Sequence, residues 1–113
     1  MHEMSIALSI CDLAAAEAHK AGGGRIKEVE VEIGTLAGVM VEALEFCFET
    51  AKRSTPLAEA NLKIVTVPAA GHCHTCGARF AADHYLVTCP ECHSFQVVIE
   101  QGKELRVKTI SIE

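Results

Sequence analysis

Hydrophobic residues recur at helical spacing along two segments of the chain. The first segment, Met4–Ala21, is predicted to form an amphipathic helix that ends at the three glycines 22–24. We expect its core-facing side to hold Ile6, Leu8, Ile10, Cys11, Leu13, Ala14 and Ala15. A second amphipathic helix is predicted to start at Val41, and Pro56 is expected to stop it. Its apolar positions are Val41, Leu44, Cys47, Phe48 and Ala51.

Three other segments follow the alternating pattern of half-buried strands. Lys27–Ile33 places Val29, Val31 and Ile33 on one face and three glutamates on the other. Asn61–Val67, which is closed by Pro68, and Glu104–Ile112 give the second and third strands. The basic residues of the last strand are expected to lie opposite the glutamates of the first strand as oppositely charged pairs.

This order of elements predicts an α+β fold. We expect a small three-stranded sheet packed with two helices, and a zinc-ribbon-like lobe inserted before the last strand. The predicted domains are residues 1–69 with 100–113, and residues 70–99. The inserted segment Gly71–Ser94 has few bulky hydrophobic residues, so burial alone cannot fold it and it needs a bound metal or a cross-link.

Charge and composition exclude several classes of function. The formal net charge is −5 and the basic residues are scattered, which argues against nucleic-acid binding. No secretory signal is recognised, and no apolar run reaches the ~20 residues that span a bilayer. We therefore expect a cytoplasmic protein that binds no membrane. Because thiols stay reduced in that compartment, the six cysteines point to metal binding or catalysis before disulfides.

Four of the cysteines form two C-x-x-C pairs. Cys73 and Cys76 make the first pair, and Cys89 and Cys92 make the second, twelve residues later. Such spacing typically brings four thiolates around one tetrahedral Zn²⁺. A site with four protein ligands has no open position, so we expect this Zn²⁺ to be structural.

Other interpretations of the cysteine segment stay open at this stage. Iron in a rubredoxin-like site is one, and the C-x-x-C-H pattern at Cys89 also matches haem attachment. His74 and His93 lie beside the cysteine pairs. They are interpreted either as exposed loop residues or as ligands that exchange with a thiolate. Cys11 and Cys47 lie on apolar helix faces and are interpreted as small core residues.

The first residues of the chain offer a different set of ligands. We expect Met1 to be retained because His2 is large, so that the terminal amine, the His2 amide and the His2 imidazole can form fused chelate rings. The amide or carboxylate of Glu3, or a residue from elsewhere in the chain, could complete a square of ligands. Square-planar coordination rich in nitrogen suits Ni²⁺ or Cu²⁺. The alternative is a solvated, frayed chain end with no metal role.

Taken together, these segments resemble the HypA/HybF family of hydrogenase maturation proteins. The resemblance rests on Met1-His2-Glu3, on "VEIGTLAGV" at Val31–Val39, on "LEFCFE" at Leu44–Glu49 and on the paired C-x-x-C. It implies a nickel chaperone that serves the large subunit of [NiFe] hydrogenase together with the GTPase HypB, and some members also serve urease. Carried over by position, it implies Ni²⁺ as cargo at His2, Glu3 and the Met1 amine. It also implies structural Zn²⁺ at Cys73, Cys76, Cys89 and Cys92.

Two rival classes of function remain. A zinc-ribbon protein-interaction module without transient cargo would explain the cysteines alone. An enzyme would need an open metal position or a nucleophile with its base, and the sequence suggests neither. We expect a monomer or a weak homodimer.

Overall fold

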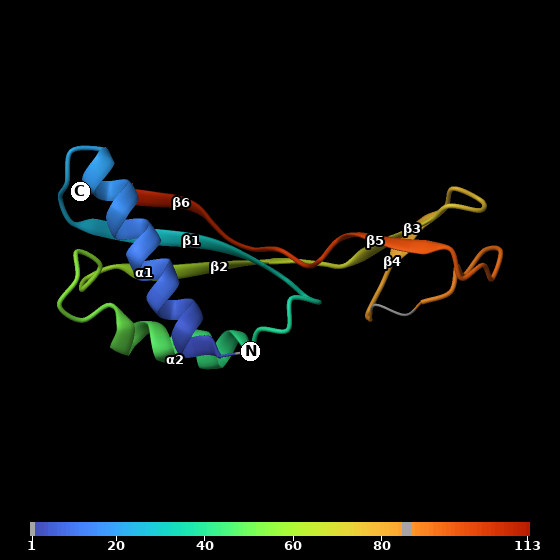
Figure 1. The fold of residues 1–113 in the computed structure, drawn as a ribbon, viewed down its shortest axis with the longest axis horizontal. Helices are drawn as coiled ribbons and strands as arrows, with labels where there is room; N and C mark the ends of the chain where they lie inside the picture. Colours follow the sequence, from blue (N-terminus) through green and yellow to red (C-terminus); the bar gives the residue numbers. More distant parts are fainter. Residues whose placement is uncertain (1, 85–86) are drawn as a thin grey trace. The chain divides into compact units, whose positions relative to one another are not determined.

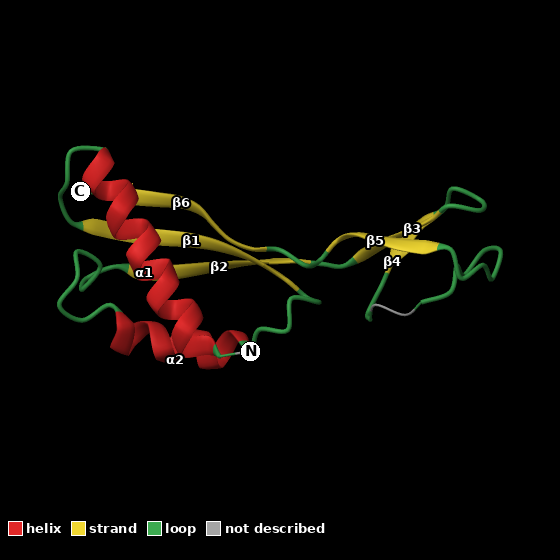
Figure 2. Cartoon of the chain, in the orientation of Figure 1, coloured by secondary structure: helices red, strands yellow, loops and turns green. Residues whose placement is uncertain are grey.

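The computed structural model describes residues 2–84 and 87–113 and has two helices and six strands in that part of the chain. Their bounds are α1 Glu3–Lys20, β1 Ile26–Gly34, α2 Val41–Ala51, β2 Asn61–Val67, β3 Ala70–Cys73, β4 Arg79–Ala81, β5 Val97–Gln101 and β6 Leu105–Ile112 (Figure 1). The strands form two three-stranded sheets, ordered β2-β1-β6 and β4-β3-β5 (Figure 2). The predicted α+β class, with two helices on a three-stranded sheet and a cysteine-bearing lobe before the last strand, is confirmed.

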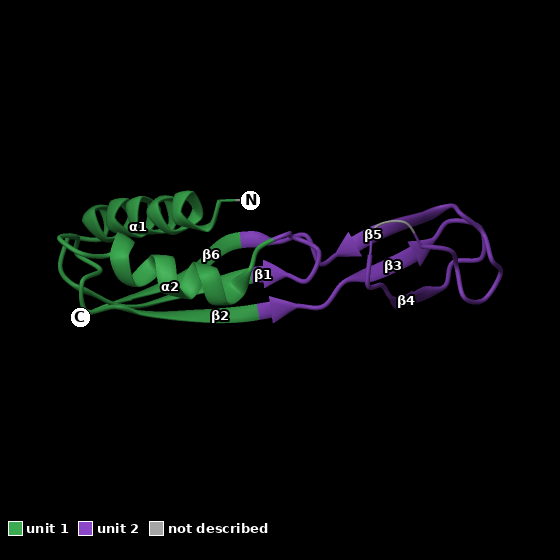
Figure 3. Cartoon of the chain, turned by 90° about the horizontal axis from the view of Figure 1, so that it is seen from below, with its two compact units in different colours: residues 1–32, 39–65, 106–113 green, residues 33–38, 66–105 purple. Residues whose placement is uncertain are grey.

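The chain divides into two compact units (Figure 3). Unit 1 holds residues 1–32, 39–65 and 106–113, and unit 2 holds residues 33–38 and 66–105. Strands β1, β2 and β6 therefore begin in one unit and end in the other. The predicted domain boundaries at residues 69/70 and 99/100 stay a prediction.

Unit 1 is a sheet with both helices on one of its faces (Figures 1 and 3). The alternation predicted for the first strand is confirmed, because Val29, Val31 and Ile33 are buried while Glu30 and Glu32 between them are partly exposed. Leu44 and Phe48 of α2 are also fully buried. These side chains give unit 1 a hydrophobic core of its own.

The buried side of α1 differs from the prediction. Leu8 and Leu13 are about half exposed, at 49% and 50%, whereas Ala7 and Ala14 are fully buried. Alanine side chains let a helix approach its neighbours closely, and α1 packs against α2. The expectation that Leu8 and Leu13 face the core was therefore wrong, although Ile10 and Cys11 are buried as predicted.

The outer face of the sheet in unit 1 carries the predicted charge pairs. Arg106 of β6 donates from Nε to Glu32 of β1. Glu30 lies 3.6 Å from the Lys63 ammonium and 3.8 Å from the Lys108 ammonium. These contacts confirm that basic residues of the last strand lie opposite the glutamates of the first strand.

Three chain segments of unit 2 contact one another: residues 33–38, 66–69 and 102–105. Backbone hydrogen bonds join them: Gly34 N–H to Glu104 O at 2.7 Å, Leu36 N–H to Gly102 O at 2.7 Å, and Thr35 N–H to Val67 O at 3.0 Å. The backbones pack so closely that a side chain on Gly34 would overlap the Gly102 carbonyl. Residues 33–38 are thus an integral part of unit 2.

The sheet of unit 2 is antiparallel and has almost no hydrophobic core. Strand β3 pairs with β4 through His72↔Arg79, and with β5 through His72↔Val98 and Cys73↔Val97. The buried hydrophobic side chains of this unit, among the residues that the structure describes, are Ile33, Ala69, Cys73 and Cys89. The predicted shortage of bulky apolar residues in the lobe is therefore real.

Neither described helix has the length and hydropathy needed to cross a membrane.

Candidate metal centre

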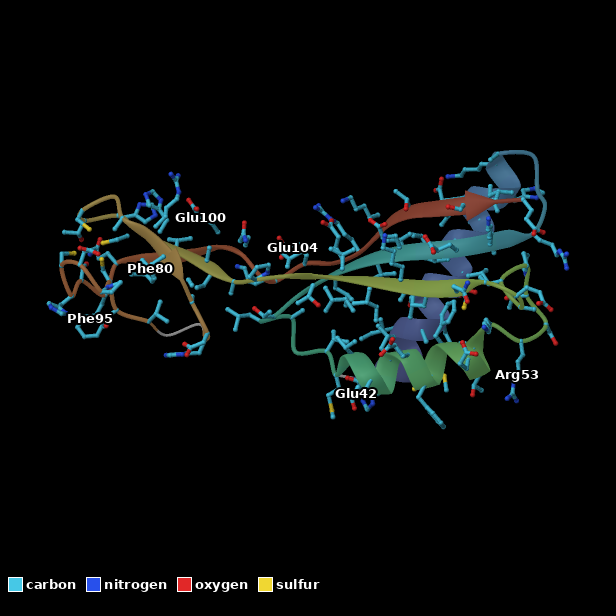
Figure 4. All side chains as sticks on the ribbon, turned by 180° about the vertical axis from the view of Figure 1, so that it is seen from behind. Glu42, Arg53, Phe80, Phe95, Glu100 and Glu104 are labelled. Carbon is cyan, nitrogen blue, oxygen red and sulfur yellow. The ribbon has the colours of Figure 1, made fainter. Side chains whose placement is uncertain are left out.

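The four predicted cysteines come together in unit 2. The Sγ atoms of Cys73 and Cys92 lie 3.6 Å apart, and those of Cys76 and Cys89 also lie 3.6 Å apart. All four sulfur atoms lie within 4.8 Å of one another. Figure 4 draws the side chains of both units, with sulfur in yellow. Within residues 2–84 and 87–113 they are the only group of three or more His, Cys, Asp or Glu side chains close enough to share one ion.

The spacing of the sulfur atoms fits a tetrahedral ion. With zinc–sulfur bonds of about 2.3 Å, neighbouring sulfurs of a regular tetrahedron lie about 3.8 Å apart. The observed 3.6 Å contacts are close to that distance. The four-cysteine cluster therefore has the donor set and the spacing of a closed Zn²⁺ site.

Both C-x-x-C turns are built in the same way. In the first turn, Gly77 N–H donates to Cys73 O at 2.9 Å, and Cys73 N–H donates to Ala78 O at 2.9 Å. In the second turn, His93 N–H donates to Cys89 O at 2.8 Å, and Cys89 N–H donates to Ser94 O at 2.9 Å. The fourth residue after the leading cysteine has a positive φ in both turns, +81° at Gly77 and +65° at His93. The two turns therefore have the same backbone conformation, and each turn holds its pair of sulfurs in the same way.

Two thiols of the cluster, those of Cys73 and Cys92, have pKa values shifted in opposite directions. The backbone N–H of Cys76, which faces the Cys73 sulfur, lowers the pKa of Cys73 to about 6. The Ser94 N–H lowers the pKa of Cys92, but burial and the neighbouring thiols outweigh it and raise that pKa to about 12. A bound cation relieves this conflict because it favours the thiolate form of every ligand.

The histidines that flank the cysteine pairs are both exposed. The ring of His74 lies 5.2 Å from the ring of His72, centre to centre. His93 occupies the left-handed position of the second turn. Exchange of either ring with a thiolate stays a prediction.

The predicted terminal ligands lie in unit 1. His2 is exposed and precedes the first turn of α1. Its carbonyl accepts a hydrogen bond from Ile6 N–H at 3.2 Å, while its imidazole does not cap the helix. The predicted amine ligand of Met1 lies outside the described residues. Glu3 is half-buried, and its Oε2 accepts a hydrogen bond from Met40 N–H at 3.1 Å.

This contact of Glu3 was not foreseen from the sequence. Met40 is the residue that precedes α2, so the Glu3 carboxylate of one helix caps the N-terminus of the other. The two residues are 37 positions apart, and only the packing of the helices brings them together. Glu3 therefore has a structural role whether or not it binds a metal.

The capping contact predicts a pH dependence. The Met40 N–H lowers the pKa of Glu3 below its ordinary value. A lowered pKa in the folded state adds stability at neutral pH, and that stability is lost as the pH falls through the lowered pKa. We expect the side-chain carboxyl of Glu3 to titrate below ordinary glutamates when followed by carbon NMR. In Glu3→Gln the acid limb of the stability curve should be flatter. An ordinary Glu3 titration would contradict the capping contact.

Comparisons with known proteins agree with this arrangement. Residues 1–112 match the family model described as "Hydrogenase/urease nickel incorporation, metallochaperone, hypA". A protein of Prosthecochloris aestuarii named hydrogenase maturation factor HypA is 46% identical over the full length of both chains, and one of Geotalea uraniireducens with the same name is 45% identical, also over both full lengths. The solution structure of the Ni metallochaperone HypA from Helicobacter pylori matches 99% of this chain and 97% of its own, with a TM-score of 0.71 and 29% identity. A further solution structure of a HypA protein covers 100% of this chain and 97% of its own, with a TM-score of 0.74 and 30% identity. The chain therefore belongs to the HypA family of hydrogenase maturation metallochaperones.

Proposed function

We propose that this protein carries Ni²⁺ at its N-terminus and delivers it for maturation of the [NiFe] hydrogenase large subunit, while the four-cysteine cluster holds structural Zn²⁺. The observation that carries the proposal is the separation of two ligand sets in a chain of this family. The thiolate set lies in unit 2, and the His2 set lies in unit 1.

The assignment of Zn²⁺ rests on geometry and chemistry. Four sulfurs at tetrahedral spacing leave no position for a substrate, and Zn²⁺ imposes no coordination geometry of its own. Cys73 and Cys89 are fully buried in a unit with few other buried side chains, so the ion would serve the fold.

The assignment of Ni²⁺ as cargo rests on the exposed end of α1. His2 is open to solvent, and no capping hydrogen bond to the helix occupies its imidazole. Because Glu3 Oε2 is held by Met40, Glu3 would assist through its backbone nitrogen or its other carboxylate oxygen. Nitrogen ligands on a terminal segment suit Ni²⁺ and can be replaced one at a time by ligands of a partner. A terminal site of this kind favours release, which a carrier requires.

The partners of this transfer follow from the family. We propose that the GTPase HypB and the hydrogenase large subunit receive or accompany the nickel in the cytoplasm, and that urease is a second recipient. The protein acts as a carrier and not as an enzyme. It works as a monomer or a weak homodimer and binds neither nucleic acid nor a membrane.

Calorimetric titration with Ni²⁺ tests the proposal on untagged, zinc-loaded protein. We expect the wild type to bind nickel with its zinc retained, and His2→Ala to lose the high-affinity phase, because the chelate rings need the imidazole. His19→Ala is the matched control, since His19 is an exposed histidine in the last turn of α1, and this variant should bind nickel as the wild type does.

The zinc content, assayed before and after the titration, separates the outcomes. If His2→Ala binds nickel as the wild type does, or if nickel enters only by expelling zinc, the terminal site is not the carrier site. A zinc-ribbon interaction module without metal cargo would then be the better account of the protein.

A further inference from the structure

We propose that His72 and His74 form a second binding site for a divalent transition-metal ion on the surface of unit 2, and that this site takes Ni²⁺. We call these two residues the histidine pair. The site is separate from the four-cysteine cluster and goes beyond the proposed function, because it does not use the terminal ligands. His72 was not predicted to be a ligand, although the alternation His72-Cys73-His74 is visible in the sequence.

The backbone places the two imidazoles on one face of a strand. Residues i and i+2 of a strand point to the same side, and the residue between them points to the other. His72 lies in β3, and His74 continues the pairing with the neighbouring segment because its N–H donates to Gln96 O at 2.8 Å. Cys73 is fully buried between them and belongs to the four-cysteine cluster. The strand thus directs sulfur to one side and imidazole to the other.

The spacing of the rings matches two ligands of one ion. The centres of the His72 and His74 rings are 5.2 Å apart, and the rings are tilted by 40°. With metal–nitrogen bonds of about 2.1 Å, two imidazoles on the same ion have centres roughly 4.6–5.3 Å apart. The separation of the rings is therefore compatible with two ligands of one ion once their nitrogens turn toward it.

A carboxylate orients the first of these rings. Glu100 Oε1 lies 3.3 Å from His72 Nδ1, and Glu100 Oε2 accepts a hydrogen bond from Arg79 Nε at 3.0 Å. The negative oxygen beside Nδ1 favours the imidazole tautomer that carries its proton there, so that Nε2 is left as a metal ligand. Glu100 is thus a positioning residue, and Arg79 holds it in place and offsets its charge. This is the arrangement of metal-binding histidines that are supported by a carboxylate.

The histidine pair is accessible and incomplete. The His72 side chain is 27% exposed, and His74 is exposed. Two imidazoles suit Ni²⁺, Cu²⁺ and Zn²⁺, and they leave the other coordination positions to water or to ligands of a partner. Such a site binds more weakly than a closed cage and exchanges its ion. These properties are those of a transfer site for a metal cargo, whereas the four-cysteine cluster has those of a structural site.

The test uses full-length, zinc-loaded protein that carries His2→Ala, so that the terminal site does not contribute. We expect Ni²⁺ titration to show a weaker second site with zinc retained, and to broaden the His72 and His74 ring signals in the NMR spectrum. Adding His72→Gln and His74→Gln should abolish this binding. Adding His84→Gln, an exposed histidine of the same unit outside the pair, should leave it unchanged.

A further variant tests the role of Glu100. In the same background, Glu100→Gln should weaken nickel binding about tenfold, as loss of a supporting carboxylate does at other metal sites. It should also move the His72 ring nitrogen shifts away from the tautomer with the proton on Nδ1, while zinc content stays the same.

The outcomes are separable from those of the proposed function. The histidine pair is ruled out as a site if His2→Ala protein binds no nickel, or if the variant that also lacks both ring ligands binds as much as His2→Ala alone. If instead His2→Ala leaves wild-type nickel binding intact, the terminal carrier site fails. The difference in nickel binding between His2→Ala protein with and without His72→Gln and His74→Gln still shows whether the histidine pair binds nickel.

Discussion

Removing the metal from the four-cysteine cluster with a chelator is expected to unfold unit 2 and leave unit 1 folded. Of the residues that the structure describes in unit 2, four have buried hydrophobic side chains, and two of these are Cys73 and Cys89 of the four-cysteine cluster. Structural Zn²⁺ contributes about 10–16 kcal/mol in small zinc-binding peptides. Because a typical domain is stable by only about 5–15 kcal/mol, loss of the ion removes most of what holds unit 2. Unit 1 keeps Val31, Leu44 and Phe48 in its own core.

The measurement is an amide NMR spectrum before and after chelation. Signals of β3, β4 and β5 should collapse to the narrow range of an unfolded chain, whereas signals of α1, β1 and α2 should stay dispersed. Cys76→Ser should reproduce the effect without a chelator. Cys47→Ser is the matched control, because Cys47 lies in α2 outside the cluster and should leave unit 2 intact. Dispersed β3–β5 signals in the metal-free protein would refute a structural role of the metal.

The second large effect is expected from Gly102→Ala. Gly102 has a φ of +110°, and a methyl group there would lie 2.5 Å from both the Cα and the Cβ of Ala69. The backbone conformation costs about 1–2 kcal/mol for a residue other than glycine. Overpacking against Ala69 adds about 1–3 kcal/mol. We therefore expect unit 2 to lose about 2–5 kcal/mol, measured by hydrogen exchange of the β5 amides in zinc-loaded protein.

A second glycine separates these two costs. Gly38 also has a positive φ, +76°, but apart from its two chain neighbours no residue has an atom within 4 Å of the position that a methyl group would take. Gly38→Ala should therefore lose only about 1–2 kcal/mol. Equal losses in the two variants would mean that the three segments at residues 33–38, 66–69 and 102–105 do not pack as closely as described.

Patterns that depend on neighbours in the chain were predictable. Strict alternation predicted which side chains of β1 are buried, because the period of a strand decides the face directly. The two C-x-x-C motifs predicted the four-cysteine cluster, since each turn places its own two sulfurs together. The opposite charges of Arg106 and Glu32 predicted a contact that the structure shows.

Features that depend on packing between distant segments were not predictable in the same way. Hydrophobicity favoured Leu8 and Leu13 as core residues, but the closeness of α1 to its neighbours selects Ala7 and Ala14 instead. Pro56 was expected to end the second helix, yet α2 ends at Ala51, because Lys52 and Thr55 already form a turn held by Thr55 N–H to Lys52 O at 3.2 Å.

The sheet of unit 2 and the contacts at its start also lay beyond local patterns. Strands β3 and β4 have four and three residues, which is too short for a periodic signal. The contact between Glu3 and Met40 joins residues that no local rule connects. The same is true of the approach of Gly34 to Gly102, which depends on how three segments cross.

The discontinuity of unit 2 limits how this protein can be cut and recombined. A fragment that starts at residue 66 lacks residues 33–38, and with them the amide groups of Thr35 and Leu36 that saturate the carbonyls of Val67 and Gly102. The carbonyls of Val67 and Gly102 would then have only water as a hydrogen-bond donor in place of these amides. The close packing of the three segments would also lack residues 33–38. Grafting the cysteine-bearing lobe onto another protein therefore requires residues 33–38 as well as residues 66–105. A single excision around the cysteine motifs would leave residues 33–38 behind.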